Sequence, residues 1–211
     1  MRYFTSDPHW GHERILTWAR PQFETIEEHD SFLVQKHLEW AKKLKPEDEF
    51  WCLGDLFKLD YFWLYKEFSC ETHLVMGNHD HHKHIDRYKE YFTYVHEYPI
   101  YISDRICVSH VPQAVFEDQL NCYGHTHGNK IDKPNYVSAC LEITNYELIS
   151  EKHLNSTLGR LPKYTRKHLE APYAEWEKVV HRPQNDLILK PNGHVDISAM
   201  RALKKFEELN K

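Results

Sequence analysis

The chain has 211 residues, of which 41% are hydrophobic and 28% are charged, and its formal net charge is -5. A chain of this length and composition buries a substantial core, which argues against extended disorder and against two full catalytic domains. Its acidic balance also argues against a broad basic surface for long nucleic acid.

The apolar segments and cysteines indicate the cellular environment. No apolar run approaches the roughly 18 residues that span a membrane, and residues 1–4 lack the longer apolar region of a secretory leader. We therefore expect a cytoplasmic protein. The five cysteines are an odd number without a Cys-x-x-Cys pair, so we expect reduced, mostly buried thiols rather than disulfides or a thiolate zinc site.

Three segments in the first 80 residues have the composition of short strands, and each runs into a polar loop: 2–5, 49–53 and 73–76. Between the first two, Leu33, Trp40, Ala41 and Leu44 recur at helical spacing, which predicts a helix over 30–44 with Asp30 as N-cap. A second short helix is predicted over 61–68. Alternating strands and helices predict an α/β fold with a partly parallel sheet, and such sheets bind ligands where their strands end.

The second half of the chain changes to short apolar stretches joined by tight loops. Strands are predicted over 98–102, 106–108, 120–123, 136–139 and 147–149. The polar loops among them carry His110, His125 and His127, whereas the loops of the first half carry carboxylates. We therefore expect the two halves to meet at one site.

From residue 150 onward the sequence becomes more polar and more helical. A final helix capped by Ser198 is predicted from an apolar stripe of Ile197, Met200, Leu203, Phe206 and Leu209. A basic cluster at Lys163, Arg166, Lys167 and His168 is interpreted as a solvated helix face, and contact with phosphate or RNA is the alternative. We predict a catalytic domain over 1–150 and a mainly helical C-terminal extension over 151–211 that packs on the core.

Seven side chains at the ends of predicted strands are suited to hard divalent metals, which choose imidazole, carboxylate and amide oxygen ligands. They are Asp7, His9, Asp55, Asn78, His110, His125 and His127. Seven ligands are too many for one ion but suit two ions if Asp55 bridges them. Two such ions can clamp a phosphate and activate water near neutral pH.

In chain order these residues form the motifs D-x-H, G-D, G-N-H-D, H and G-H-x-H across residues 7–127, and this series resembles the calcineurin-like metallophosphoesterase superfamily. The opening D-x-H-x-x-H, from Asp7 to His12, is similar to small bacterial and phage phosphoesterases. The resemblance implies a four-layer α/β/β/α sandwich of two mixed sheets, with the C-terminal extension additional to it. It also implies which residues hold each ion: Asp7, His9, Asp55 and His127 the first, and Asp55, Asn78, His110 and His125 the second.

The resemblance further implies that Asp55, Asn78 and His79 are catalytic, with His79 contacting the phosphate and donating a proton to the leaving oxygen. His12 is a candidate substrate contact, and the alternative for it is a polar residue at the start of a helix. Many family members carry a carboxylate three residues after the bridging aspartate, but this chain has Lys58 there. Asp60 and Asp80 are the candidates to orient His79 in its place.

The implied activity is metal-dependent hydrolysis of a phosphate ester, by in-line attack of a hydroxide held by two divalent ions. A phosphodiester, such as a cyclic nucleotide or a short nucleic-acid end, is the favoured substrate. The alternatives are a phosphomonoesterase acting on a nucleotide, sugar phosphate or phosphoprotein, and a non-catalytic scaffold of the same fold. Manganese is the favoured metal, with iron, nickel, cobalt and zinc as alternatives. We expect no membrane partner, and the oligomeric state stays open.

Aromatic and histidine residues near these motifs have competing interpretations. Trp10, Trp51 and Trp63 are candidates to stack on a nucleobase. Trp10 is the better candidate, although a core position is its alternative role, and Trp51 is expected in the core. His81, His82 and His84 follow the G-N-H-D motif, and we expect solvated loop residues there rather than a third metal site.

Overall fold

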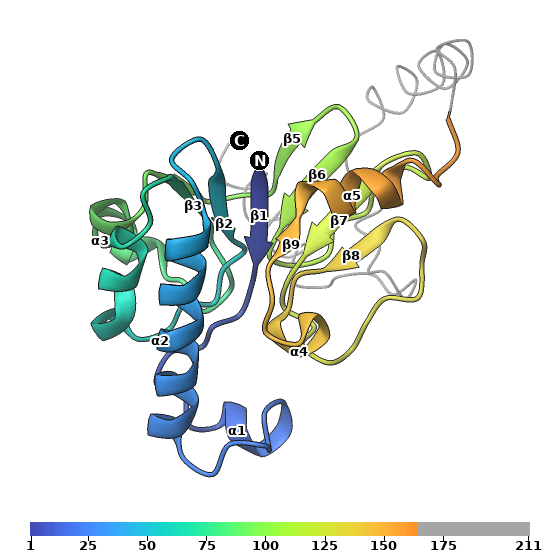
Figure 1. Cartoon of the computed structure of the whole chain (residues 1–211). Coiled ribbons are helices and arrows are strands. Elements are labelled where there is room, and N and C mark those ends of the chain that lie inside the picture. The colour runs from blue at the N-terminus through green and yellow to red at the C-terminus, as the bar shows by residue number, and fades with distance from the viewer. Residues whose placement is uncertain (164–211) are drawn as a thin grey trace, which may run out of the picture. The chain divides into compact units, whose positions relative to one another are not determined.

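The computed structural model describes residues 1–163, which contain two β-sheets (Figure 1). The first sheet has the strand order β4-β3-β2-β1-β9. Its strands are β1 (Arg2–Thr5), β2 (Glu49–Cys52), β3 (Glu71–Val75), β4 (Tyr94–His96) and β9 (Ile149–Ser150). The first four are parallel to their neighbours, and β9 is antiparallel to β1. β4 was not among the predicted strands.

The second sheet comes from the middle of the chain and has the order β5-β6-β7-β8. Its strands are β5 (Ile100–Ser103), β6 (Ile106–Ser109), β7 (Leu120–Tyr123) and β8 (Tyr136–Ser138). β5 is antiparallel to β6, whereas β6, β7 and β8 are parallel. Both sheets are therefore mixed, as predicted.

Two hydrophobic clusters form because successive residues of a strand point to opposite faces. On β2, Phe50 and Cys52 belong to the cluster that includes the residues of α2, while Trp51 belongs to the cluster shared with the second sheet. Val108 of β6 and Cys122 of β7 belong to that second cluster. Strands buried on both faces have continuous apolar runs, which is why they could be recognised in the sequence.

Helices flank the sheets: α1 (Ile15–Trp18), α2 (Ile26–Lys43), α3 (Ile85–Tyr91), α4 (Leu141–Thr144) and α5 (Glu151–Leu158), together with short 3-10 helices over Leu59–Lys66 and His82–His84. Helices α2 and α3 lie on one side of the first sheet in Figure 1. The α/β fold of two mixed sheets with flanking helices is thus confirmed.

The start of α2 corrects the sequence prediction. The helix begins at Ile26, and Thr25 is its N-cap because the Thr25 side chain accepts a hydrogen bond from the N–H of Glu28. Asp30 lies one turn into the helix and is buried, and its carboxylate accepts the N–H of Gly11. Aspartate is a residue type that often caps helices, but the Asp30 carboxylate accepts its hydrogen bond from a neighbouring loop and not from its own helix.

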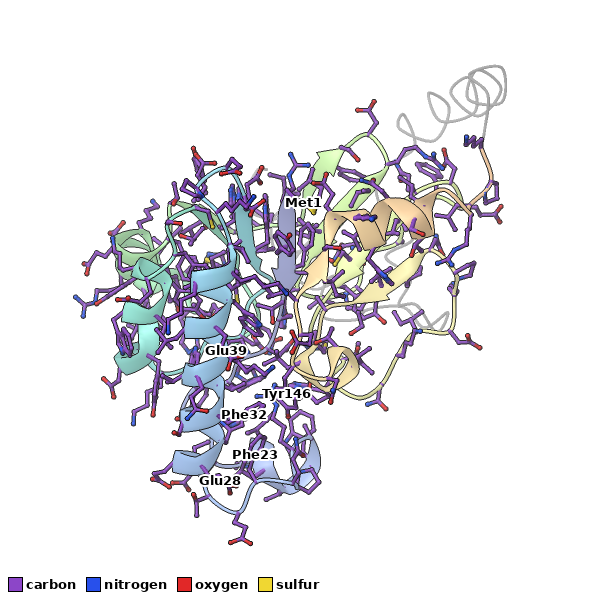
Figure 2. The ribbon with its side chains drawn as sticks, viewed as in Figure 1. Met1, Phe23, Glu28, Phe32, Glu39 and Tyr146 are labelled. Atoms are coloured by element: carbon purple, nitrogen blue, oxygen red, sulfur yellow. The ribbon has the colours of Figure 1, made fainter. Side chains whose placement is uncertain are left out.

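An aromatic cluster fixes the loop between α1 and α2 to the rest of this unit. Phe23, Phe32 and Tyr146 gather at the lower end of α2 in Figure 2, with ring centroids 5.1 to 6.1 Å apart. Gln22 donates a hydrogen bond to the Tyr146 hydroxyl at 2.6 Å. Residues 19–25 are therefore held against the turn that follows α4.

Met1–Pro162 form one compact unit. It includes α5, which contacts β1 and β7 and places Leu154 in the core. The division at residue 150 and the helical character of 151–211 stay predictions. The helix capped by Ser198 and the basic residues Arg166, Lys167 and His168 lie outside the described residues. Within the described residues, none of the helices combines the length and apolar character of a membrane span.

All five cysteines are free and buried, as expected. Trp10 is fully buried: its ring stacks on Tyr61, and its Nε1 donates to the Tyr65 hydroxyl. The Trp10 ring is therefore a core element and is not accessible to a nucleobase.

Candidate metal centre

Parallel strand pairing brings the polar loops to one edge of the two sheets. In the first sheet, Thr5 pairs with Cys52 and Cys52 with Leu74, so β1, β2 and β3 end in register. In the second, Ser109 pairs with Tyr123, so β6 and β7 also end together. The seven candidate ligands lie in the loops that directly follow these five strands.

Six of the seven candidates form two groups of three. The first is Asp7, His9 and His127, and the second is Asp55, His110 and His125. Within each group, one ligand atom per residue lies within 4.8 Å of the others. Five of the six residues are buried, and His125 is exposed. Each group has the mixed nitrogen and oxygen character that first-row divalent metals accept.

Asp55 lies between the two groups. Its Oδ2 is 3.3 Å from Nε2 of His110 in its own group and 3.5 Å from Nε2 of His9 in the other. Its Oδ1 accepts the backbone N–H of His79 at 2.9 Å, which fixes the carboxylate orientation. One oxygen is thus held by the backbone while the other faces both groups, which is the geometry of a bridging ligand.

Asn78 joins the second group. His110 Nδ1 donates to the carbonyl of Leu53 at 2.7 Å, so its Nε2 faces the site. That Nε2 lies 2.9 Å from Oδ1 of Asn78 and 3.2 Å from Nδ1 of His125. Separations of about 3 Å are expected between adjacent ligands that each lie about 2.1 Å from one ion.

The first group contains polar atoms that lack protein partners. Asp7 Oδ2 accepts the N–H of His125, while Asp7 Oδ1 lies 3.7 Å from Nε2 of both His9 and His127. Among residues 1–163, Asp7 Oδ1 and both ring nitrogens of His9 are buried without a hydrogen bond. Buried polar atoms are almost always satisfied, so this cluster fits the coordination of a cation.

The charges of the site also favour cations. Burial raises the pKa of Asp7, but the neighbouring imidazoles of His9, His110 and His127 lower it more, so the carboxyl stays ionised. Burial lowers the pKa of His110, yet Asp55 and Asp7 raise it to about 9. The ionised carboxylates of Asp7 and Asp55 thus attract positive charge to the site. A divalent ion bound there would displace the proton from His110.

Five of the candidate ligands have left-handed backbones, with positive φ: Asp7, His9, Asp55, His125 and His127. Such conformations are uncommon outside glycine and cluster where geometry serves function. Gly124 precedes His125, and a Cβ at Gly124 would meet Oγ of Ser6 and Oδ2 of Asp7. This glycine therefore allows the histidine loop to approach the aspartate loop.

The sequence did not indicate the buried pair that supports the first group. Arg20 is 0% exposed and donates to the carbonyls of Asp7 and Pro8. Its Nε also donates to Oε1 of Glu142 at 2.9 Å, and that oxygen accepts from Nδ1 of His127 at 2.9 Å. Arg20 and Glu142 thus fix the Asp7 loop and the His127 ring; an isolated Arg and Glu carry no motif that would reveal this.

The candidates to orient His79 have other partners. Asp80 is buried, and its carboxylate accepts the N–H groups of Asp55, Leu56 and Gly77. Asp60 is exposed and pairs with Lys58 at 3.5 Å. Asp80 therefore joins the loops after β2 and β3, and in the described part of the chain neither carboxylate bonds to the His79 ring.

His12 and His79 both lie beside the first group. The His12 ring stacks on His9 with centroids 5.3 Å apart, and the His79 ring meets His9 edge-on at 5.6 Å. Burial and the neighbouring His9 lower the pKa of His12 to about 4, so it is neutral at pH 7. Two further imidazoles thus lie beside the first ligand group. Of the three histidines expected to be solvated, His81 and His82 are exposed and His84 is half-buried.

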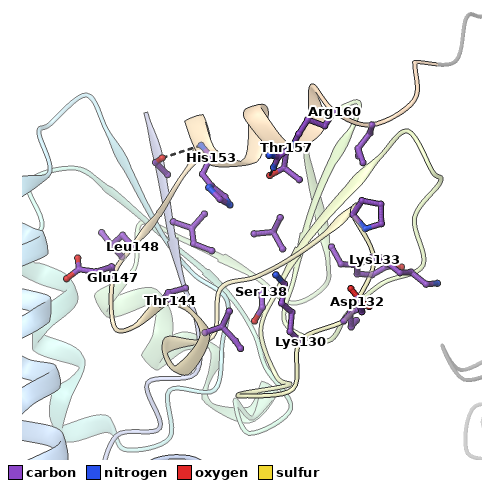
Figure 3. A pocket seen from close by; sticks show the side chains of 18 residues that line it. Lys130, Asp132, Lys133, Ser138, Thr144, Glu147, Leu148, His153, Thr157 and Arg160 are labelled. Carbon is purple, nitrogen blue, oxygen red and sulfur yellow. Dashed lines mark hydrogen bonds between the residues drawn. The ribbon is translucent and has the colours of Figure 1, made fainter.

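A separate pocket of about 870 Å³ lies between α5 and the loop before β8 (Figure 3). Lys130, Ser138, His153, Thr157 and Arg160 are among its lining residues. None of its lining residues is a candidate metal ligand. The metal centre is therefore identified by its converging donor atoms and not by the size of a cavity.

Comparison with known proteins agrees with this geometry. The family model described as calcineurin-like phosphoesterase matches residues 3–197. The uncharacterized protein MJ1445 of Methanocaldococcus jannaschii is 24% identical over 163 residues, which cover 70% of this chain and 85% of that protein. The crystal structure of the protein of unknown function AQ665 from Aquifex aeolicus has 28% identity and a TM-score of 0.59, covering 74% of this chain and 98% of that one. Neither name describes a reaction, so the substrate must be argued from the residues.

Proposed function

Since the chain belongs to the calcineurin-like phosphoesterase family, we propose that it hydrolyses a phosphodiester, such as a cyclic nucleotide or a short nucleic-acid end, with two divalent ions. The observation that best supports the two-ion hydrolysis in this proposal is the position of Asp55. Its Oδ2 lies 3.5 Å from Nε2 of His9 and 3.3 Å from Nε2 of His110. One carboxylate oxygen facing both ligand groups suits a pair of ions better than two independent sites.

The first ion would be held by Asp7, His9, Asp55 and His127, and the second by Asp55, Asn78, His110 and His125. When bound, two such ions supply Lewis acidity, which activates water near neutral pH and neutralises charge on the phosphoryl oxygens. Manganese is the metal that we favour for both positions, and iron, nickel, cobalt and zinc are the alternatives.

The protein's own side chains would position the ester and transfer protons. The amide of Asn78 offers a donor to a phosphoryl oxygen while its Oδ1 faces the second ion site, 2.9 Å from His110 Nε2. His79 is exposed at this edge and would protonate the leaving oxygen. The His12 ring is a neighbour of the His79 ring, with centroids 6.1 Å apart, and His12 would contact the ester.

A phosphomonoesterase would use the same residues, so the two activities must be separated by substrate choice. The proposed test compares bis(p-nitrophenyl) phosphate with p-nitrophenyl phosphate, using protein stripped with a chelator and then reloaded with manganese. We expect the diester to have the higher kcat/KM. A higher kcat/KM for the monoester would overturn the diester preference while keeping the phosphoesterase class.

Asp55→Asn and Asp60→Asn provide a matched pair for the same assay. Asp55 is buried between the ligand groups, whereas Asp60 is exposed and pairs with Lys58. We expect Asp55→Asn to lower turnover at least 100-fold and Asp60→Asn to change it less than threefold. A folded Asp55→Asn variant with the same activity as the wild type would contradict the proposed role of Asp55. A wild-type protein that binds two ions but shows no turnover would favour the scaffold alternative.

A further inference from the structure

Two large aromatic side chains are exposed beside the metal centre. Trp18 is 57% exposed, and its ring meets His127 edge-on with centroids 4.5 Å apart. Phe57 is 46% exposed, and its ring lies 4.4 Å from that of His12. Burying such rings is favourable, so exposed rings at a polar site suggest a ligand that covers them.

These two side chains end one continuous row of rings. The row runs Trp18, His127, His9, His12, Phe57, and successive centroids are 4.5, 5.0, 5.3 and 4.4 Å apart. His127 and His9 belong to the first ligand group, and the His79 ring lies 6.1 Å from Phe57. An ester bound at the metal centre would therefore have an aromatic side chain on either side of it.

The backbone around Trp18 is held in place, so its exposure is not that of a frayed loop. Ile15 and Arg20, which flank it in sequence, are both 0% exposed. Arg20 bonds to the Asp7 and Pro8 carbonyls, and the N–H groups of Ala19 and Arg20 both donate to the Ile15 carbonyl. The buried neighbours thus present the indole ring next to His127.

Phe57 has a conformation that a bulky residue rarely adopts. Its φ is +77°, in the region that favours glycine. Phe57 pairs with Trp10 in an isolated bridge, and the Trp10 N–H donates to the Leu56 carbonyl at 2.9 Å. The fold alone would be served better by glycine here, so a strained, exposed phenyl ring indicates a role in binding.

We propose that Trp18 and Phe57 form a subsite that binds a flat aromatic group of the phosphate ester, such as a nucleobase. This inference rests on the proposed function, and it makes the two residues determinants of substrate specificity. Aromatic side chains bind flat rings by stacking or by edge contacts, and base stacking tolerates different bases because every base has a π face. Esters that carry an aromatic group should therefore bind more tightly than those that lack one.

The test measures binding, and it does not need turnover. Isothermal titration calorimetry on the manganese-loaded full chain would compare two matched pairs of ligands: methyl phosphate with phenyl phosphate, and ribose 5-phosphate with adenosine 5′-monophosphate. We expect the aromatic member of each pair to bind at least tenfold more tightly. A preference in both pairs identifies nucleotides as suitable ligands, whereas a preference for phenyl phosphate alone identifies simple aryl esters.

Trp18→Ala and Phe57→Gly should each reduce the aromatic preference to about threefold or less, while the affinity for methyl phosphate changes less than twofold. Phe57→Gly should also keep or raise the melting temperature, because glycine relieves the left-handed backbone. Trp63→Ala is the matched control, since Trp63 is 44% exposed and lies outside the row of rings. It should leave the preference unchanged.

Equal affinities within both wild-type pairs would overturn the inference, and so would a preference that both folded variants retain. Failure of the proposed function gives a different result, since hydrolysis is measured separately. Loss of turnover with an intact aromatic preference would contradict the enzyme and keep the subsite. Turnover without an aromatic preference would keep the enzyme and contradict the subsite.

Discussion

The Nδ1 of His127 lies 2.9 Å from Oε1 of Glu142, and the same carboxylate oxygen accepts a hydrogen bond from the buried Arg20. Burial raises the pKa of Glu142, but His127 and Arg20 lower it more, so Glu142 stays ionised. An ionised partner on Nδ1 directs Nε2 of His127 toward the first ligand group and increases its basicity.

Replacing Glu142 with glutamine should therefore weaken metal binding at the first group. The side chain keeps its shape but loses the charge that orients His127 and pairs with Arg20. We expect manganese affinity to fall by about 10-fold to 100-fold, measured by calorimetry on chelator-stripped protein. Glu147→Gln is the control because Glu147 is exposed and pairs with Lys36. An unchanged affinity in folded Glu142→Gln protein would show that Glu142 is not a positioning residue.

Gly124→Ala should destabilise the fold and disturb the Asp7 carboxylate. Its Cβ would overlap Ser6 Oγ and Asp7 Oδ2, the oxygen that accepts the His125 N–H. We expect the free energy of unfolding to fall by about 1–3 kcal/mol in urea denaturation. At Gly128 a Cβ would meet nothing within 4 Å, so Gly128→Ala should change it by about 0.5 kcal/mol or less. Similar stabilities for the two variants would contradict the close approach at Gly124.

His37 should make the fold sensitive to acid. It is 1% exposed and packs against Trp10 and Trp40, and its Nε2 is buried without a partner among the described residues. Burial lowers the pKa of His37 to about 4. In the unfolded chain His37 binds a proton near pH 6.5, whereas in the folded protein it does so only near pH 4. The free energy of unfolding therefore keeps the full contribution of neutral His37 above pH 6.5 and loses it as the pH falls toward 4.

His37→Leu removes this titration while it fills a similar volume. Between pH 6.5 and 4.5 we expect the wild type to lose about 2 kcal/mol more than the variant, since each pKa unit corresponds to about 1.4 kcal/mol. Urea denaturation at a series of pH values would measure this difference in the free energy of unfolding. Contributions from the other titrating groups cancel in the difference because both proteins share them. Parallel curves for the two proteins would contradict the assignment to His37.

The sequence predicted the strands next to the site because they are buried on both faces, which gives continuous apolar runs such as Phe50 to Leu53. It predicted where the candidate ligands gather because parallel strands end at one edge. β9 was predicted as 147–149, but the paired residues are Ile149 and Ser150. A strand this short is defined by pairing with β1 more than by its own composition.

The supporting residues could not be predicted in the same way. Arg20 and Glu142 are 122 positions apart, and only the folded chain brings them together at 2.9 Å. Trp10 was a candidate for stacking, yet its ring points into the core while Trp18 is exposed beside His127. Asp30 resembled an N-cap because its chemistry suits one, and its true partner, the N–H of Gly11, lies in another loop.

The central claim is that two ligand groups joined by Asp55 bind two ions that support hydrolysis. It is tested most directly by measuring manganese per chain in wild-type and Asp55→Asn protein after equilibrium dialysis, alongside turnover of bis(p-nitrophenyl) phosphate. The account predicts two ions per wild-type chain, turnover that a chelator abolishes and manganese restores, and fewer ions with at least 100-fold lower turnover in Asp55→Asn. One ion or none bound to fully active wild-type protein, or full activity of Asp55→Asn, would contradict it.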